Sequence, residues 1–169
     1  MQDEAYDEDI TYPLDVLQSF EIKGNKINKH KTLRVNFTTY DMRRGSDFIK
    51  TSSESADIMV LSGETEEAAP FWYARVLGIH SVVVARKDKP ESERRIEFLR
   101  IRWFGQEDGF TSGDKAMRLD RIGFIKSTDT AQQYGLMDPS LIVRRAHIIP
   151  TFALGHTYND PGTAAPAQS

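Results

Sequence analysis

Aromatic side chains and arginines are the residues of this sequence whose types could carry out molecular recognition. Aromatic ring faces attract methylated ammonium groups, and guanidinium groups bind phosphates. The aromatic candidates for a cage are Tyr40, Trp72, Tyr73 and Phe104. The candidates for a basic face, which fall on polar sides of the expected strands or beside them, are Arg34, Arg43, Arg44, Arg75, Arg100 and Arg102. The residue types therefore leave open an aromatic cage or a surface for phosphates.

Both sets also have a purely structural interpretation. Large rings fill the core of a small β-domain, where each buries roughly 150–250 Å². Alternation along IEFLRIRWF places Trp103 with Leu99 on a side expected in the core, whereas Phe104 shares the other side with Arg102. The arginines can pair with acidic side chains across strands, at a few tenths of a kcal/mol per pair.

Motifs for catalysis and metal binding are missing from the sequence. The nucleophile elbow, the phosphate loop and the dinucleotide fingerprint are absent, and no cysteine is present as a nucleophile or zinc ligand. The four histidines do not stand at metal-ligand spacing, and His80 and His147 are expected to be core or edge residues of apolar strands. We therefore expect no catalytic residues, no cofactor and no bound metal.

The charged residues are unevenly distributed along the 169 residues, whose formal net charge is −3. Residues 1–22 contain seven acidic side chains and no Lys or Arg, while residues 23–50 contain eight basic and two acidic ones. This asymmetry is typical of a solvated flexible leader, of an acidic tail that covers a basic surface, or of an interaction arm. No apolar run approaches the roughly 18–20 residues of a membrane span, and the acidic start does not resemble a signal peptide. The lack of cysteine fits an intracellular protein.

Alternating and β-branched residues predict about six strands with little helix. The expected strands are LRVNFTT, ADIMVLSG, FWYARVLGIHSVVVAR, IEFLRIRWF, LDRIGFIK and LIVRRAHIIP. Gly78 predicts a bulge inside the longest strand, and KDKPESER predicts a charged hairpin turn. This pattern favours a small antiparallel barrel of SH3-like type. We expect an acidic-then-basic flexible leader over residues 1–31, one β-barrel-like domain over 32–157 and a disordered tail over 158–169.

The succession ADIMVL, FWYARVLGI and FLRIRWFG resembles the strand order of bromo-adjacent homology (BAH) domains. This resemblance implies a distorted β-barrel of chromatin-associated modules, which bind histone tails or other proteins. After the Trp-Phe pair, where BAH domains continue with a proline-containing R-P-E-E, this chain has GQEDG. That departure weakens a direct transfer of BAH partner contacts.

A longer string of words covers most of residues 33–157, from LRVNFTTYDMRRGSD to LIVRRAHIIPTFALGHT. It is similar to a segment near the C-terminus of fungal Plavaka-type, CACTA-like transposon-encoded proteins. In those proteins the DDE nuclease core lies upstream, and nothing in this chain corresponds to it. The resemblance implies an accessory domain, a relic or a domesticated fragment, without cleavage activity.

The sequence as a whole predicts a mainly β, BAH-like distorted barrel with disordered termini. Its expected function is non-catalytic recognition of a protein or histone peptide on chromatin, in the nucleus and without a membrane partner. The alternative is a nucleic-acid-binding accessory domain of a transposase. The sequence leaves the oligomeric state and the identity of the ligand open.

Overall fold

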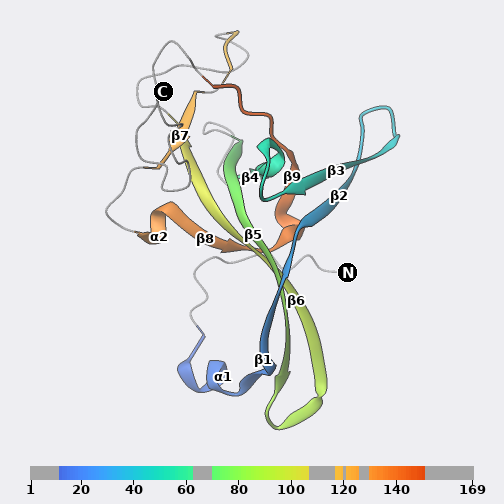
Figure 1. The fold of residues 1–169 in the computed structure, drawn as a ribbon, viewed down its shortest axis with the longest axis vertical. Helices are drawn as coiled ribbons and strands as arrows, with labels where there is room; N and C mark the ends of the chain where they lie inside the picture. The colour runs from blue at the N-terminus through green and yellow to red at the C-terminus, as the bar shows by residue number, and fades with distance from the viewer. Residues whose placement is uncertain (1–11, 63–69, 107–116, 120, 126–129, 151–169) are drawn as a thin grey trace, which may run out of the picture.

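The computed structural model describes residues 12–62, 70–106, 117–119, 121–125 and 130–150 (Figure 1). These residues form a mainly β structure in which all strand pairs are antiparallel, as predicted. The helical elements are α1 (Leu14–Gln18), η1 (Glu54–Ala56), α2 (Thr130–Gln133) and η3 (Pro139–Leu141). The strands are β1 (Phe20–His30), β2 (Thr32–Thr38), β3 (Arg44–Lys50), β4 (Asp57–Leu61), β5 (Phe71–Arg86), β6 (Lys89–Gln106), β7 (Ile122–Phe124), β8 (Tyr134–Met137) and β9 (Ile142–Arg145). Among the described residues, no helix is long and apolar enough to cross a membrane.

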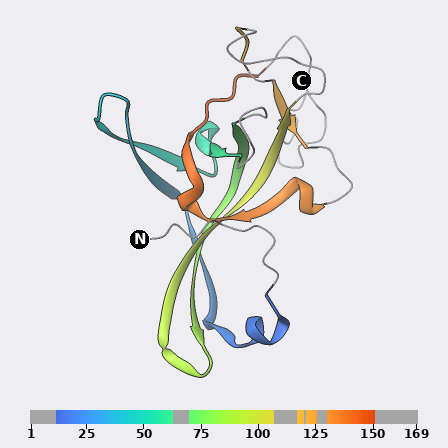
Figure 2. The same ribbon diagram turned by 180° about the vertical axis from the view of Figure 1, so that it is seen from behind.

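The strands form one large open sheet and one separate hairpin. The large sheet has the order β7-β6-β5-β4-β9, with β1 added to β5 and β8 added to β6, while β2 and β3 pair only with each other (Figures 1 and 2). Within the described residues no pairing joins the outer strands β7 and β9, so the sheet does not close. The mainly β, antiparallel class is therefore confirmed, but the described strands of the predicted SH3-like, BAH-like distorted barrel do not close into a barrel.

The length of β5 and β6 explains why the sheet stays open. These strands have 16 and 18 residues, and their outer halves run beyond the core to a turn at Lys87 and Asp88. There they pair with β1 rather than curling back over the core (Figure 1). We call this three-stranded part, made of β1 with residues 79–86 and 89–99, the arm. The sequence KDKPESER, interpreted as a hairpin turn, mostly belongs to the strand β6.

The predicted flexible leader over residues 1–31 needs a correction. Its second half forms α1 and β1, and β1 pairs with β5 through partners such as Ile22 with Val84 and Ile27 with Val82. The polar stretch between the two pairs contains Gly24 with a φ of 65° and interrupts the register, which hid the strand from a search for regular alternation. Residues 1–11 and 151–169 lie outside the described part, and so does the tail predicted for residues 158–169.

Two further strands, β3 and β8, lie in segments outside the six strands that the sequence predicts, where loops are expected. β3 contains Gly45, Ser46 and Asp47, which have low strand propensity, yet it pairs with β2 over its whole length and buries Ile49 completely. β8 has only four residues and places Met137 opposite Leu99 of β6. In both cases pairing with a neighbour that is distant in sequence or strongly β-forming outweighs the local preference.

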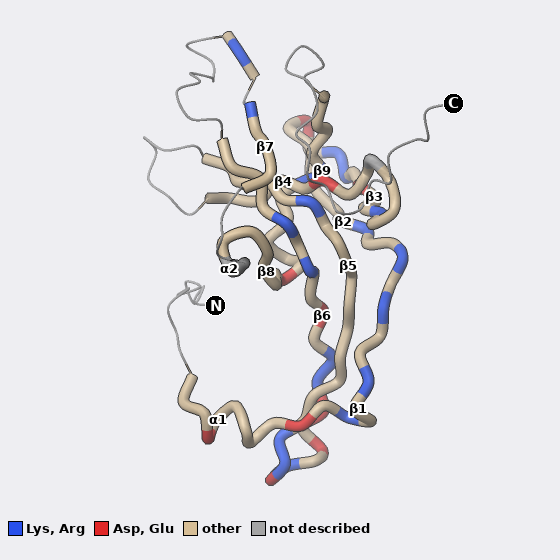
Figure 3. The backbone as a smooth tube through the Cα atoms, turned by 60° about the vertical axis from the view of Figure 1, so that its left-hand side comes forward, with Lys and Arg blue, Asp and Glu red and all other residues tan. Residues whose placement is uncertain are grey.

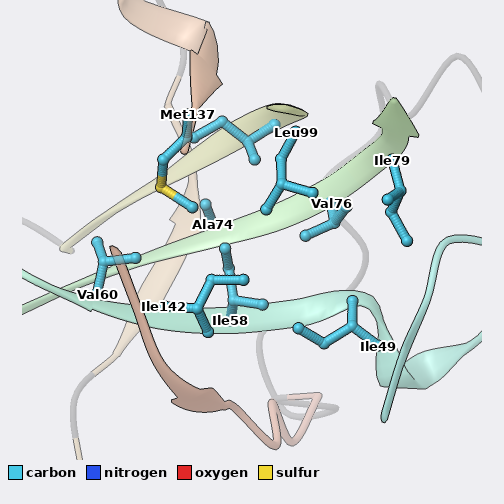
Figure 4. Close-up of a cluster of buried hydrophobic side chains, with 10 residues drawn as sticks. Ile49, Ile58, Val60, Ala74, Val76, Ile79, Leu99, Met137 and Ile142 are labelled. Carbon is cyan, nitrogen blue, oxygen red and sulfur yellow. The ribbon is translucent and has the colours of Figure 1, made fainter. Parts of the chain in front are cut away.

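The core consists of side chains from the neighbouring strands β4, β5, β6, β8 and β9 of the large sheet, together with Ile49 of β3 (Figure 4). Leu99 and Ile101 of β6 are fully buried, and Trp103 packs against them in the same cluster, which confirms the alternation predicted for this strand. The predicted bulge in β5 is also confirmed, because the pairing register shifts between Val76 and Gly78. The remaining buried side chains of the cluster are Ile49, Ile58, Val60, Ala74, Val76, Ile79, Met137 and Ile142.

Candidate functional site

The structure places the candidate residues on two surfaces, except for Trp72, which belongs to neither. Tyr73, Arg75, Arg100, Arg102 and Phe104 share the outer side of the large sheet. Arg34, Tyr40, Arg43 and Arg44 lie on the β2–β3 hairpin and its connecting turn. Trp72 faces the opposite side of β5 from Tyr73 and meets the edge of Trp103, with ring centroids 5.8 Å apart.

On the outer side of the large sheet, charged residues form a row across neighbouring strands. The register places Asp57, Arg75, Arg102 and Tyr134 side by side on β4, β5, β6 and β8. Two guanidinium groups directly opposite each other would repel. Asp57 offsets this repulsion by accepting hydrogen bonds from Nε and Nη2 of Arg75, at 2.7 and 2.9 Å.

Aromatic rings flank this charged row. Phe104 stacks on Phe124 with centroids 4.4 Å apart, and the guanidinium carbon of Arg75 lies 5.3 Å from the Phe124 centroid. The guanidinium carbon of Arg102 lies 4.0 Å from the Phe124 centroid and 5.7 Å from that of Tyr134. The protein's own arginines therefore occupy positions that a methylated ammonium would take in a cage.

The predicted cage of Tyr40, Trp72, Tyr73 and Phe104 is consequently not assembled. Tyr73 lies opposite Phe104, but Trp72 is on the other side of the strand and Tyr40 belongs to the turn of the β2–β3 hairpin. The physical reason is the period of the strand, since neighbouring residues such as Trp72 and Tyr73 must point to opposite sides.

The hairpin presents a second, more accessible surface, which we call the hairpin face. Its cross-strand pairs Thr32–Lys50, Arg34–Phe48, Asn36–Ser46 and Thr38–Arg44 share one side. The opposite side carries Leu33, Val35 and Ile49, which pack on the core and so hold the hairpin in place. None of the eight residues of the hairpin face is acidic.

The cations of the hairpin face lie beside an exposed ring. The guanidinium carbon of Arg34 is 6.0 Å from the centroid of Phe48, whose exposed fraction is 51%. Asp47 points to the other side of β3 and accepts a contact of 3.4 Å from Nε of Arg144, so it does not neutralise Arg34. Arg34 and Arg44 also line a shallow hollow of about 470 Å³.

The turn at the end of the hairpin holds a further ring in solvent. The backbone N–H of Thr39 donates to the carbonyl of Arg43 at 2.7 Å, and that of Met42 donates to the carbonyl of Thr39 at 2.9 Å. Arg43 forms an ion pair of 2.9 Å with Asp41. These bonds order the turn while the ring of Tyr40 stays fully exposed.

The charge of the described part differs from that of the whole chain. Of the 25 acidic residues of the sequence, 14 lie outside the described residues, but only two of the 22 basic residues do. The described strands are therefore strongly cationic, and Lys and Arg recur along β1, β6 and the β2–β3 hairpin (Figure 3). The net charge of −3 concealed this excess.

Sequence reasoning missed several residues of both surfaces. Phe48 and Lys50 were placed in a loop, although Arg44, Ser46, Phe48 and Lys50 alternate with Gly45, Asp47 and Ile49 in a pattern that could have revealed the strand. Tyr134 and Phe124 had no such signal, because only the fold brings β7 and β8 to β6.

Among the described residues, no group of three or more His, Asp or Glu is close enough to hold a metal ion. A second open hollow of about 400 Å³ is lined by Thr51, Ser52, Ser53, Ala56 and Arg75.

Comparisons with protein families, curated proteins and solved structures found no match for this chain.

His80 gives the fold a predicted pH dependence. Its ring stacks on Phe98 with centroids 5.3 Å apart, and its pKa is lowered, mainly because burial disfavours the charged ring and further because of Arg100, Lys29 and His30. The unfolded chain then binds more protons than the folded one between the lowered pKa and about 6.5. Stability should therefore rise with pH across this window and fall as the pH drops through it.

Urea unfolding at pH values from 5 to 8 would measure this dependence. His80→Gln should flatten the stability profile below about pH 6.5, because glutamine does not titrate in this range. A profile that keeps the wild-type slope in the variant would contradict the assignment to His80.

Proposed function

We propose that this protein is a non-catalytic module that binds single-stranded nucleic acid through the hairpin face. The observation that supports this function most directly is that Arg34 and Lys50 flank the exposed ring of Phe48, with Arg44 farther along the same side, which carries no carboxylate. Proteins that bind single strands combine cations for the phosphates with aromatic rings on which the bases stack. The hairpin face offers both.

The geometry fits an unpaired strand better than a duplex. Stacking on Phe48 or Tyr40 requires a base whose face is free, and bases in a duplex are already stacked. Arg34 and Arg44 are four positions apart along the hairpin, or roughly 13 Å, with the polar pair Asn36–Ser46 between them. Amide and hydroxyl groups at that place can bond to sugar and phosphate oxygens without selecting a sequence.

The BAH-like part of the prediction belongs to the same proposal. The words ADIMVL, FWYARVLGI and FLRIRWFG, on which the resemblance rests, correspond to β4, β5 and β6, which are neighbours in the sheet. We place the module in the nucleus, as an accessory domain of transposon-derived origin. Binding of a histone tail receives less support, because the described surface is cationic, as histone tails are, and the four candidate rings do not come together in one cage.

The test is the affinity for a fluorescein-labelled oligo-dT, measured by anisotropy over a series of salt concentrations. Reversing two charges in the variant Arg34→Glu with Arg44→Glu should weaken binding at least about tenfold, since it replaces attraction to phosphates by repulsion. If both arginines contact phosphates, the slope of log K against log salt should become shallower by about 1.4.

The matched control has the same change in charge at a distant place. Arg86→Glu with Arg95→Glu alters two exposed arginines of the arm that are already paired with Asp88 and Glu97. This control should retain the wild-type slope, and Phe48→Leu should lower the affinity while leaving the slope unchanged. Equal losses in the hairpin and arm variants would reject the hairpin face as the binding site, as would a histone-tail peptide that binds more tightly than the oligonucleotide.

A further inference from the structure

The arm is amphipathic in an unusual way, because the side that is apolar is open to solvent. Direct cross-strand partners point to the same side, so the rows Ile27–Val82–Ile96 and Ile22–Val84–Arg94 belong together. We call this side the arm face. The exposed fractions are 44% for Ile22, 55% for Ile27 and 46% for Ile96, whereas Val82, between Ile27 and Ile96, is only 7% exposed.

The charges of the arm are sorted between its two sides. The arm face carries Lys29, in the row Lys29–His80–Phe98, and Arg94, and it continues to Arg100 opposite Gly78. The reverse side carries the acidic residues Glu21, Glu93 and Glu97. There the carboxylates are matched by cations, since Lys23 pairs with Glu21 at 2.8 Å and Arg95 with Glu97 at 3.2 Å.

We infer that the arm face is a docking surface for an acidic amphipathic segment of a partner protein. The apolar side of that segment would cover the exposed isoleucines Ile22, Ile27 and Ile96, and its carboxylates would meet Lys29, Arg94 and Arg100. Complementary charge and these half-exposed isoleucines together favour such a partner. This inference goes beyond the proposed function, because it uses a different surface and a different class of partner.

Other occupants fit the arm face less well. Aliphatic side chains offer a nucleic acid neither a ring on which to stack nor a hydrogen bond. An anionic bilayer would also attract the three cations, so binding of anionic vesicles is measured beside binding of the peptides. A second copy of the chain would place the same cations against each other in a symmetric contact.

Three labelled peptides probe the two parts of this recognition with the full chain. The first is an amphipathic helix of about 18 residues with Leu on one side and Glu on the other. The second replaces each Glu by Lys, and the third replaces each Leu by Ser. The first peptide should bind at least about tenfold more tightly than either of the others, because only it supplies both the apolar area and the opposite charge.

Variants on the two sides of β6 locate the site. Arg94→Ser should weaken binding of the Leu/Glu peptide about threefold, whereas Arg95→Ser, one residue away on the reverse side, should leave it unchanged. Ile27→Ser with Ile96→Ser should weaken it about tenfold or more. Thermal unfolding of each variant checks that the arm is still folded. If the double isoleucine variant does not fold, the comparison of Arg94→Ser with Arg95→Ser still tests the inference.

Several results would overturn the inference. These are equal effects of Arg94→Ser and Arg95→Ser, equal binding of the Glu and Lys peptides, and preferential binding of anionic vesicles over the Leu/Glu peptide. Sedimentation that shows a dimer lost on Ile96→Ser would assign the face to a second copy. Oligo-dT binding by the same variants should remain at the wild-type level, so failure here can be told apart from failure of the hairpin proposal.

Discussion

Asp57→Ala should lower the free energy of unfolding by about 1.5–3 kcal/mol, because it removes charge-assisted hydrogen bonds from a guanidinium that is 36% exposed. The side chain of Asp57 has an exposed fraction of only 4%, and both of its oxygens accept bonds from Arg75. Without this carboxylate, Arg75 loses both bonds while it still faces Arg102 directly across the strand pair. Urea unfolding followed by tryptophan fluorescence would measure the loss.

The surface pair Asp41–Arg43 provides the matched comparison for Asp57. Both partners are more than half exposed, at 55% and 84%, so Asp41→Ala should change stability by less than about 0.5 kcal/mol. Asp57→Ala combined with Arg75→Leu should recover part of the loss, because the repulsion between Arg75 and Arg102 is then gone. Similar losses for Asp41→Ala and Asp57→Ala would show that the charged row does not stabilise the sheet.

Leu99→Ala is the second change with a large expected effect, a loss of about 2–5 kcal/mol. Leu99 is fully buried between β5 and β8, at the place where the arm leaves the core. The substitution removes apolar contacts and leaves a cavity that the surrounding strands cannot fill by small shifts.

Ile96→Ala, only three residues away on the same strand, provides a comparison between the stability effects of a core substitution and an arm substitution. Its side chain is 46% exposed and lies on the arm face, so the loss should be below about 1.5 kcal/mol. Guanidinium unfolding of both variants gives the comparison. If Ile96→Ala were as costly as Leu99→Ala, the arm face would have to be covered in solution, and the docking inference would fail with it.

The alternation of side chains in β5 and β6 was enough to predict much of the core. It placed Leu99, Ile101 and Trp103 on one side of β6 and Phe104 with the arginines on the other, as the structure has them. This success has a simple cause, since both strands are long, rich in β-branched and aromatic residues, and paired with each other along the chain.

The parts that escaped prediction depend on partners distant in sequence or on irregular registers. β1 is interrupted at Gly24, and β3 contains glycine and aspartate, so neither shows a clean alternation. The prediction of the candidate site was incomplete for the same reason. The sequence could assign Arg75 to a polar side, but it could not place Asp57 beside it or bring Phe124 and Tyr134 to the same face.

The continuous β5–β6 hairpin also has a consequence for the order of folding. Its two strands are adjacent in sequence and close through a turn of two residues, Lys87 and Asp88, whereas β4 and β9 bring together Ile58 and Arg145 from distant parts of the chain. Local pairings form faster than those that must close a long loop. When synthesis on the ribosome reaches Gln106, all of β1 to β6 has been made, and only β7, β8 and β9 are still missing from the sheet. We therefore expect an intermediate during synthesis that is built around the β5–β6 hairpin. In this intermediate β4, which contains Ile58, has not yet paired with β9.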